Sequence, residues 1–153
     1  NYPVDIASTY ANSMAPGSYI NIYYKSLNDK GEVMFGKFIS NVKVLDVKDS
    51  SGQHVFENSE DTRTPAYMLF ALPEETHLLL RKALYLKEYA VELILVPNTT
   101  TLTEKDKVQV SSDDIENFIN SKTAFVSVNE LPKVEDQVKE DTDKKDNDTK
   151  TNR

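Results

Sequence analysis

Two β-prone runs on either side of a short turn constrain the fold of this chain more than any other feature. The first run, residues 19–24 (YINIYY), consists mainly of β-branched and aromatic residues, which favour strands. The turn at residues 28–31 (NDKG) ends in Gly31, which can adopt a positive φ. The second run, residues 33–47, is the longest β-prone segment. The sequence therefore predicts a β-hairpin with one long strand, which we expect to follow a bent or bulged course, with Gly36 as the candidate bend.

Shorter patterns around this hairpin predict additional strands and a helix. Three further strands are expected, at residues 2–6, 66–72 and 91–96. The second of these is a continuous apolar run, which is typical of a strand buried on both faces. Pro73, followed by two acidic residues, is typical of a helix start. The apolar face of that helix has spacings of four and three, with Leu79, Ala83 and Leu86.

Together these elements predict a β-dominated α+β fold, with a twisted antiparallel or mixed sheet and one packed helix. This domain is expected to span residues 1–98. Residues 99–131 are expected to form a connector, with a short helix capped by the sequence SSDD at residues 111–114 and an edge strand or extended arm at residues 124–128. Residues 132–153 alternate acidic and basic side chains and have little apolar surface to bury, so a disordered charged tail is expected there.

Charge and composition exclude several classes of function. The net charge is -7 and no stretch concentrates Lys and Arg, so the chain lacks the cationic surface that nucleic acids or anionic membranes attract. The absence of cysteine removes disulfides, thiolate catalysis and cysteine zinc sites. No apolar run approaches the roughly 18 residues that cross a bilayer. Because the chain starts at Asn1 without a signal peptide, we expect any membrane anchor to lie upstream in the full-length protein.

No recognisable catalytic motif is present, and we predict no catalytic, cofactor-binding or metal-binding residues. The two histidines, His54 beside a turn and His77 in the expected helix, are interpreted as surface residues, although a small enzyme that uses one of them stays an alternative. The serines lie in turn or cap sequences, and the four glycines form no phosphate-binding loop. Two groups of carboxylates could hold a hard cation but lack the EF-hand pattern, and we interpret them as turn and cap residues: Asp46 with Asp49, and Asp113, Asp114 with Glu116.

Three tyrosines of the first run are the candidate interface residues. The two-residue period of a strand places Tyr19 and Tyr23 on one face and Tyr24 on the other. One face is expected to pack in the core, and exposed tyrosines on the other would suit a partner interface, where Tyr is enriched. Ordinary cross-strand packing is the alternative interpretation.

Four segments, in order and at matching spacing, resemble one known family. Residues 2–5 (YPVD) resemble its v-P-V-D opening, and residues 15–22 (APGSYINI) stand where the family has R-P-G-D-R-V-D-V. Residues 38–47 (FISNVKVLDV) are similar to l-L-Q-N-V-r-V-L-a-V. Residues 67–96 follow its sequence of a strand, a helix that starts t-P-E, and a strand i-x-L-x-L-R. Over its first 97 residues the chain thus resembles the domain of the CpaB/RcpC family, assembly proteins of the Flp (Tad) pilus.

This resemblance implies a non-enzymatic assembly or scaffold component of an Flp/Tad-type pilus or a related secretion apparatus. Such proteins act through protein–protein contacts in the cell envelope, outside the cytoplasmic membrane, as secreted or membrane-tethered chains. The implied partners are other pilus or secretion-system proteins, or further copies of the same chain. Because some domains of the related SAF fold group bind sugars, a carbohydrate- or cell-wall-binding module is the alternative. The assembly function predicts an exposed apolar or aromatic patch near residues 19–24 or along the sheet edge.

Overall fold

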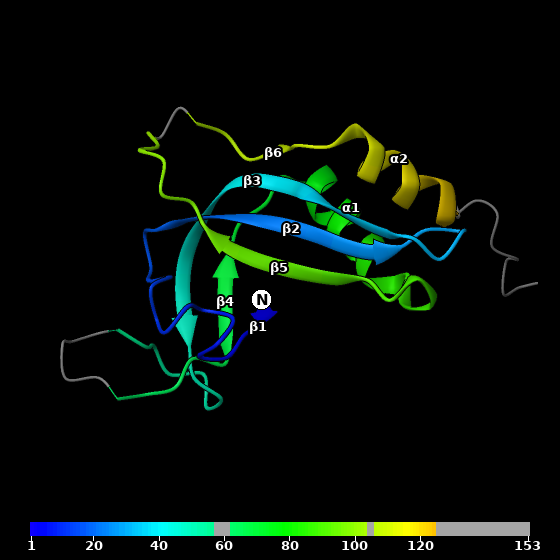
Figure 1. Ribbon diagram of the computed structural model, residues 1–153. Helices are drawn as coiled ribbons and strands as arrows, with labels where there is room; N and C mark the ends of the chain where they lie inside the picture. The colour runs from blue at the N-terminus through cyan, green and yellow to red at the C-terminus, as the bar shows by residue number, and fades with distance from the viewer. Residues whose placement is uncertain (57–61, 104–105, 125–153) are drawn as a thin grey trace, which may run out of the picture. The chain divides into compact units, whose positions relative to one another are not determined.

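An antiparallel sheet built around the β2–β3 hairpin organises the chain (Figure 1). The computed structural model describes residues 1–56, 62–103 and 106–124, and its first compact unit is Asn1–Thr123. The described elements follow in the order β1 (Tyr2–Pro3), β2 (Tyr19–Leu27), β3 (Val33–Lys48), β4 (Tyr67–Phe70), α1 (Glu74–Tyr85), the 3-10 helix η1 (Lys87–Tyr89), β5 (Glu92–Pro97), β6 (Gln109–Val110) and α2 (Asp113–Lys122). Residues 125–128 of the expected edge strand and the expected tail at 132–153 lie outside the described residues.

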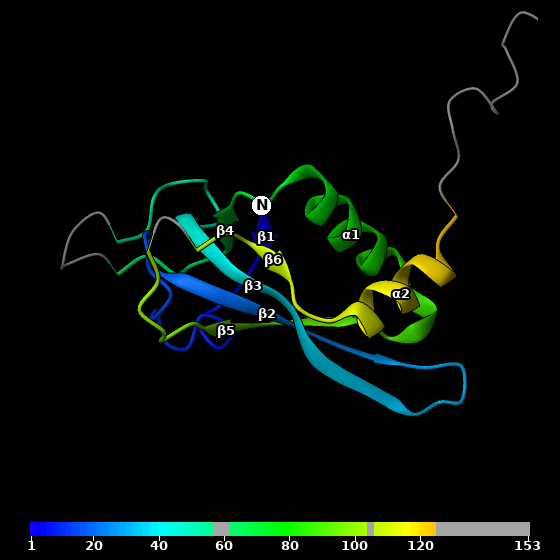
Figure 2. The ribbon, with the colours of Figure 1, turned by 90° about the horizontal axis from the view of Figure 1, so that it is seen from above.

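The sheet has the strand order β1-β4-β3-β2-β5, with β6 paired to β3, and every pairing is antiparallel. It is strongly curled, so that β4 runs across the direction of β2 and β5 (Figure 1). Both helices lie on one side of the β2–β3 hairpin (Figure 2). The predicted β-dominated α+β fold is therefore confirmed, and the sheet is antiparallel rather than mixed.

The turn of the β2–β3 hairpin has the predicted chemistry. Gly31 adopts a φ of +77°, and the backbone N–H of Asn28 donates to the Glu32 carbonyl at 2.9 Å. The Asn28 side-chain oxygen accepts from the backbone N–H groups of Lys30 and Glu32, each at 2.9 Å. The side chain of Asn28 thereby satisfies loop donors that would otherwise lack a protein partner.

The long strand β3 bends at bulges and not at Gly36. Its register against β2 shifts twice between Lys37 and Val42, which leaves Phe38 as an extra residue and sets two β3 residues opposite Asn21. Asn41, within the second shift, has a φ of +62°, a conformation that Asn tolerates better than most residues. Gly36 pairs in register with Tyr24 instead. The predicted bulged course of β3 is therefore confirmed, and the irregularities lie at Phe38 and Asn41 rather than at Gly36, because an isolated glycine does not reveal an inserted residue.

Gly36 has a packing role. A Cβ atom at this position would come within 3.2 Å of Cδ1 of Ile115 on α2, closer than most Cβ contacts. The missing side chain therefore lets α2 approach β3.

The core lies between the inner face of the sheet and the two helices. The predicted apolar face of α1 is confirmed, because Leu79, Ala83 and Leu86 are all buried. α2 buries Ile115 and Ile119. Its predicted cap is also confirmed, since the Ser112 side chain accepts from the Ile115 N–H at 3.3 Å.

The compact unit extends beyond the expected domain boundary at residue 98. β6 pairs with β3, and α2 packs against both β3 and α1. Two contacts tie α2 to the hairpin turn and to η1: Lys122 Nζ lies 2.6 Å from Asp29 Oδ2, and the Phe118 ring meets Tyr89 at 5.3 Å in a T-shaped pair. The polar composition of residues 99–107 suggested a separate connector, but these long-range contacts join β6 and α2 to the same body.

Two expected strands are shorter in the structure. β1 ends at Pro3, because Asp5 begins a turn that is closed by a hydrogen bond from the Ser8 N–H to Asp5 Oδ1 at 2.7 Å. β4 buries Met68 but leaves Tyr67 exposed, so the expectation of a strand buried on both faces was wrong for this end of the sheet.

Candidate protein-binding surface

The two faces of the β2–β3 hairpin differ in what covers them. Side chains of β2 that point inward, including Ile20, Ile22 and Tyr24, are buried beneath the helices. Side chains that point outward, including Lys25 and Leu27, are exposed. Within the described part of the chain, no helix lies over this outer face (Figures 1 and 2).

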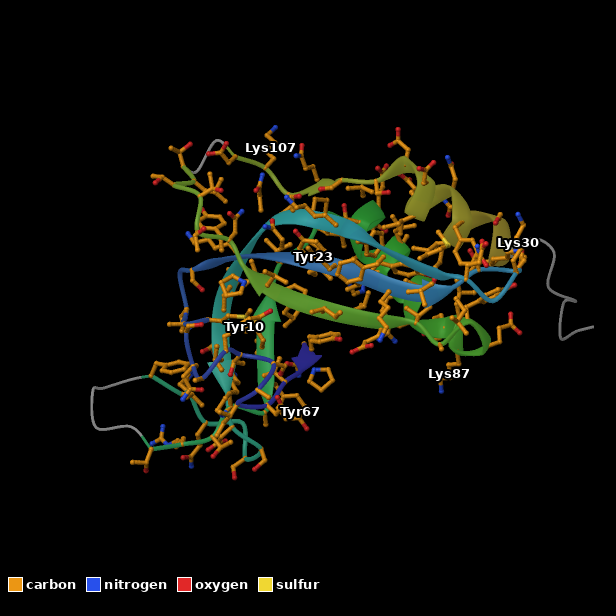
Figure 3. All side chains as sticks on the ribbon, viewed as in Figure 1. Tyr10, Tyr23, Lys30, Tyr67, Lys87 and Lys107 are labelled. Atoms are coloured by element: carbon orange, nitrogen blue, oxygen red, sulfur yellow. The ribbon has the colours of Figure 1, made fainter. Side chains whose placement is uncertain are left out.

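Four apolar side chains gather on the outer face, and we call them the outer patch: Tyr23, Leu27, Val33 and Phe35. Leu27 pairs directly with Val33 across the hairpin, beside the turn. Phe35 is 62% exposed and Val33 is 65% exposed. The Phe35 and Tyr23 rings stack with centroids 5.7 Å apart and an interplanar angle of 23°. Figure 3 shows Tyr23 on this face of β2.

Charged groups surround the outer patch. Lys25 Nζ forms an ion pair with Glu92 Oε2 on β5 at 2.8 Å, and Lys37 pairs with Tyr23 across the strands. Exposed aliphatic and aromatic side chains within a polar rim are typical of a protein–protein contact surface.

The three predicted interface tyrosines have different environments. Tyr23 belongs to the outer patch, whereas Tyr24 is fully buried against Phe38 and cannot contact a partner in the folded protein. Tyr19 lies on the same face of β2 as Tyr23 but lines a separate hollow. The two-residue period therefore separated the faces correctly, and Tyr24 belongs to the core.

Sequence reasoning did not identify Leu27, Val33 and Phe35. The signal was available, because Tyr23, Lys25 and Leu27 alternate before the turn while Val33, Phe35 and Lys37 alternate after it. Pairing these two series across the turn at residues 28–32 would have placed them on one face.

The hollow beside Tyr19 has a volume of about 420 Å³ and is lined by Tyr19, Asn41, Lys43, Pro73, Asp106, Lys107 and Val108. Asn41, which lines this hollow, belongs to a network of asparagine side chains. Asn98 Nδ2 donates to Asn21 Oδ1 at 3.3 Å and to Asn41 Oδ1 at 3.2 Å. Asn41 Nδ2 in turn donates to the Lys107 carbonyl at 3.3 Å. This network fixes the bulge of β3 against the end of β5, and no local sequence pattern revealed it.

The histidines and carboxylates singled out in the sequence serve local contacts. His54 Nδ1 lies 2.8 Å from Asp46 Oδ2, and His77 is exposed on α1. Asp49 Oδ1 accepts from the N–H groups of Ser51 and Gln53 at 2.8 and 2.9 Å, which is turn chemistry. Asp113, Asp114 and Glu116 lie in the first turn of α2. Among the described residues, no group of three or more His, Asp or Glu side chains is arranged to hold a metal ion.

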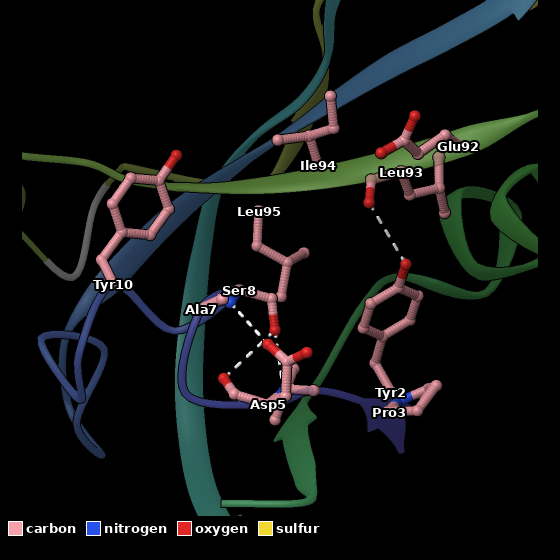
Figure 4. Close-up of a pocket in the computed structure, with 11 residues that line it drawn as sticks. Tyr2, Pro3, Asp5, Ala7, Ser8, Tyr10, Glu92, Leu93, Ile94 and Leu95 are labelled. Carbon is pink, nitrogen blue, oxygen red and sulfur yellow. Dashed lines mark hydrogen bonds between the residues drawn. The ribbon is translucent and has the colours of Figure 1, made fainter.

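A second concave surface lies between β5 and the N-terminal segment (Figure 4). This groove has a volume of about 520 Å³. Residues 92–95 form one wall, and the other consists of residues 2–5 with Ala7, Ser8 and Tyr10. The Tyr2 hydroxyl donates to the Leu93 carbonyl at 3.3 Å across the groove. Burial of Tyr2 raises the pKa of its hydroxyl, and the nearby Glu92 carboxylate adds to this shift.

Comparisons with known proteins found no match to this chain among family models, curated proteins or solved structures. None of the helices in the described ranges has the length and apolar character needed to cross a membrane.

Proposed function

We propose that this chain is a non-enzymatic assembly or scaffold component of an Flp/Tad-type pilus or a related secretion apparatus, and that it binds other proteins through the outer patch. The sequence resemblance to the CpaB/RcpC family supports the biological setting. The observation that carries the binding role is Phe35, which is 62% exposed and whose ring stacks on Tyr23.

The physical basis of the proposal is preorganisation. Both rings project from paired strands, so little side-chain freedom is lost when a partner covers them. Aromatic anchors surrounded by charged groups dominate the binding energy of many interfaces. In this proposal Lys25 and Lys37 help to orient the partner, and the apolar side chains provide most of the affinity.

The proposal also specifies where the protein acts and with what. The protein works on the outer side of the cytoplasmic membrane, either secreted or membrane-tethered. Its partners are other pilus or secretion-system proteins, or further copies of the same chain. Genes for a pilus ATPase and for prepilins beside the gene of this protein would support this setting.

Co-purification from membranes with matched variants tests the proposal. Full-length protein is compared with Phe35→Ser and with Tyr85→Ser, since Tyr85 is a 67% exposed aromatic residue on α1. We expect pilus or secretion proteins to co-purify with the wild type and with Tyr85→Ser, and to be lost with Phe35→Ser. Equal recovery with all three proteins, or recovery of none of these partners with the wild type, would contradict the proposal.

Carbohydrate or cell-wall binding is a second candidate, supported by the hollow beside Tyr19. An aromatic ring next to amide and ammonium groups can stack on a sugar while polar groups bind its hydroxyls. We expect this function, if present, to give saturable binding to insoluble peptidoglycan that Tyr19→Ala abolishes and Phe35→Ser leaves intact. The opposite pattern, with membrane partners lost only in Phe35→Ser, favours the assembly function.

A further inference from the structure

We propose that the free edge of β5 binds an extended, basic peptide segment of a partner protein as an added strand. The segment would occupy the groove between β5 and the N-terminal residues and so close the curled sheet. This inference goes beyond the outer patch, because it concerns a different surface and a different mode of binding.

The backbone of β5 defines which groups the added strand would meet. The Asn98 N–H donates to the Tyr19 carbonyl at 2.8 Å, which makes residues 19 and 98 a hydrogen-bonded pair. In an antiparallel ladder such pairs alternate, so every second residue of β5, counted back from Asn98, directs its N–H and C=O toward β2. The backbone groups of Leu93 and Leu95 therefore point to the free edge. In the described part of the chain, no backbone group pairs with them on that side.

The groove leaves room for one strand beside this edge once the Tyr2 side chain, which now crosses it to the Leu93 carbonyl, turns aside. β1 pairs with β4, and it reaches the β5 edge through a side chain, the Tyr2 hydroxyl. Neighbouring strands of a sheet lie about 4.8 Å apart. The gap between β1 and β5 is wider than this, because a whole tyrosine side chain bridges it. Figure 4 shows residues 2–5 and β5 as opposite walls, joined by the Tyr2 hydrogen bond.

The N-terminal wall is held in a conformation that costs energy. Tyr10, Ala11 and Asn12 are three consecutive residues with positive φ, at 51°, 53° and 66°. A left-handed backbone is unfavourable for residues other than glycine, and such strain is concentrated at functional sites. Hydrogen bonds hold the segment in place, among them the Thr9 hydroxyl to the Asp5 carbonyl at 2.8 Å and the Ala11 N–H to the Ile6 carbonyl at 2.9 Å.

The charge of the groove indicates which kind of peptide would bind there. Asp5 lines the N-terminal wall, and hydrogen bonds from Ser8 lower the pKa of its carboxyl, so it is ionised at neutral pH. Glu92 lines the β5 wall but is ion-paired with Lys25, so Asp5 supplies the uncompensated negative charge of the groove. A basic segment would be attracted to this groove, and a second copy of this chain offers none, because no stretch of it concentrates Lys and Arg. Inward side chains of the added strand would meet the buried Leu93 and Leu95, which requires alternate apolar residues.

A peptide titration tests the proposal directly. The probe is the blocked heptapeptide KVKVKVK, followed by the amide NMR signals of the 15N-labelled protein. We expect shifts at residues 2–8 and 92–95, and slower hydrogen exchange at the Leu93 and Leu95 amides. The peptide KVKPKVK lacks one backbone N–H and should bind about tenfold more weakly. The peptide EVEVEVE should not bind.

Protein variants separate this groove from the other surfaces. Asp5→Asn keeps an acceptor for the Ser8 N–H but removes the charge, and should weaken KVKVKVK binding about two- to fivefold. Asp49→Asn neutralises another turn carboxylate and should leave binding unchanged. Phe35→Ser should also bind normally, so failure here is distinguishable from failure of the proposed function. No binding at millimolar peptide, equal binding of the proline peptide, or shifts confined to the outer patch would overturn the proposal.

Discussion

Two aromatic pairs on the β2–β3 hairpin have the same ring separation and opposite surroundings. Tyr24 and Phe38 lie on the inner face, with centroids 5.7 Å apart at 67°, and both are fully buried. Tyr23 and Phe35 lie on the outer face, also 5.7 Å apart, but Phe35 is largely exposed. The comparison separates two uses of an aromatic pair: the inner pair stabilises the fold, and the outer pair is available to a partner.

The difference arises from the neighbours of each pair and not from the pairs themselves. The bulges of β3 turn Phe38 and Ile39 inward in succession, where α1 and α2 complete their burial. Phe35 lies before the bulges, on the regular part of the hairpin, and points to the uncovered face. Mutations at these positions should therefore affect stability and binding separately.

The largest expected effect is the loss of stability when the inner aromatic pair is disrupted. Phe38→Ala should lower the free energy of unfolding by about 3–5 kcal/mol, because it leaves a cavity in a well-packed core. Phe35→Ala should change it by less than about 0.5 kcal/mol, since the ring buries little surface in the monomer. Urea denaturation of both variants measures the difference. Similar losses would show that the outer pair is part of the fold.

Gly36→Val tests the contact between the hairpin and α2. The added side chain would collide with Ile115, and overpacking of this kind costs about 1–3 kcal/mol. Lys37→Val adds a branched side chain one residue away on the outer face and serves as the control, with little expected change. If both variants are equally stable, α2 does not depend on the space at Gly36.

Asn41→Val tests the bulge that turns β3. A β-branched residue at a φ of +62° costs about 1–2 kcal/mol, and the variant also loses the side-chain bonds to Asn98 and Lys107. Asn41→Gly tolerates the backbone conformation and should cost less. Equal destabilisation of the two variants in thermal unfolding would mean that the side-chain network, which both variants lose, and not the backbone conformation sets the requirement for Asn.

The smallest expected effect is a pH dependence at the contact between the turn and α2. The hydrogen bond from Lys122 lowers the pKa of Asp29 below its ordinary 3.8 and raises the pKa of Lys122 above its ordinary 10.5. The Asp29 contribution is therefore present above pH 3.8 and is lost as the pH falls through the folded pKa. The Lys122 contribution is present below pH 10.5 and is lost as the pH rises through its folded pKa.

The stability difference between wild type and Asp29→Asn should be constant around neutral pH and shrink in strong acid. Denaturation at pH 7 and at about pH 2.5 measures it. A difference that persists unchanged in acid would show that the ion pair contributes nothing to holding α2.

Local patterns in the sequence were sufficient to predict the hairpin, its turn, α1, β5 and the cap of α2. Each of these depends on neighbours in the chain, such as the φ of Gly31 or the spacing of Leu79 and Ala83. The two-residue period of the strand also placed Tyr23 and Tyr24 correctly on opposite faces.

Features that depend on distant contacts were not predictable. The bulge at Asn41 is stabilised by Asn98 and Lys107, which are far away in the sequence. α2 belongs to the first compact unit because of contacts such as that between Lys122 and Asp29. The outer patch is a different case, because its signal was available in the sequence and was missed only because Val33 was not paired with Leu27 across the turn.

The most direct test of the outer patch is site-specific photo-crosslinking in cells that express the full-length protein. A photoreactive amino acid replaces Phe35 in one variant and Tyr85 in another, so that both faces are sampled with equally exposed positions. We expect a discrete crosslinked protein from position 35, identified by mass spectrometry as a pilus or secretion component or a second copy of this chain, and none from position 85. No adduct at position 35, or the same adducts at both positions, would contradict a binding role for the outer face.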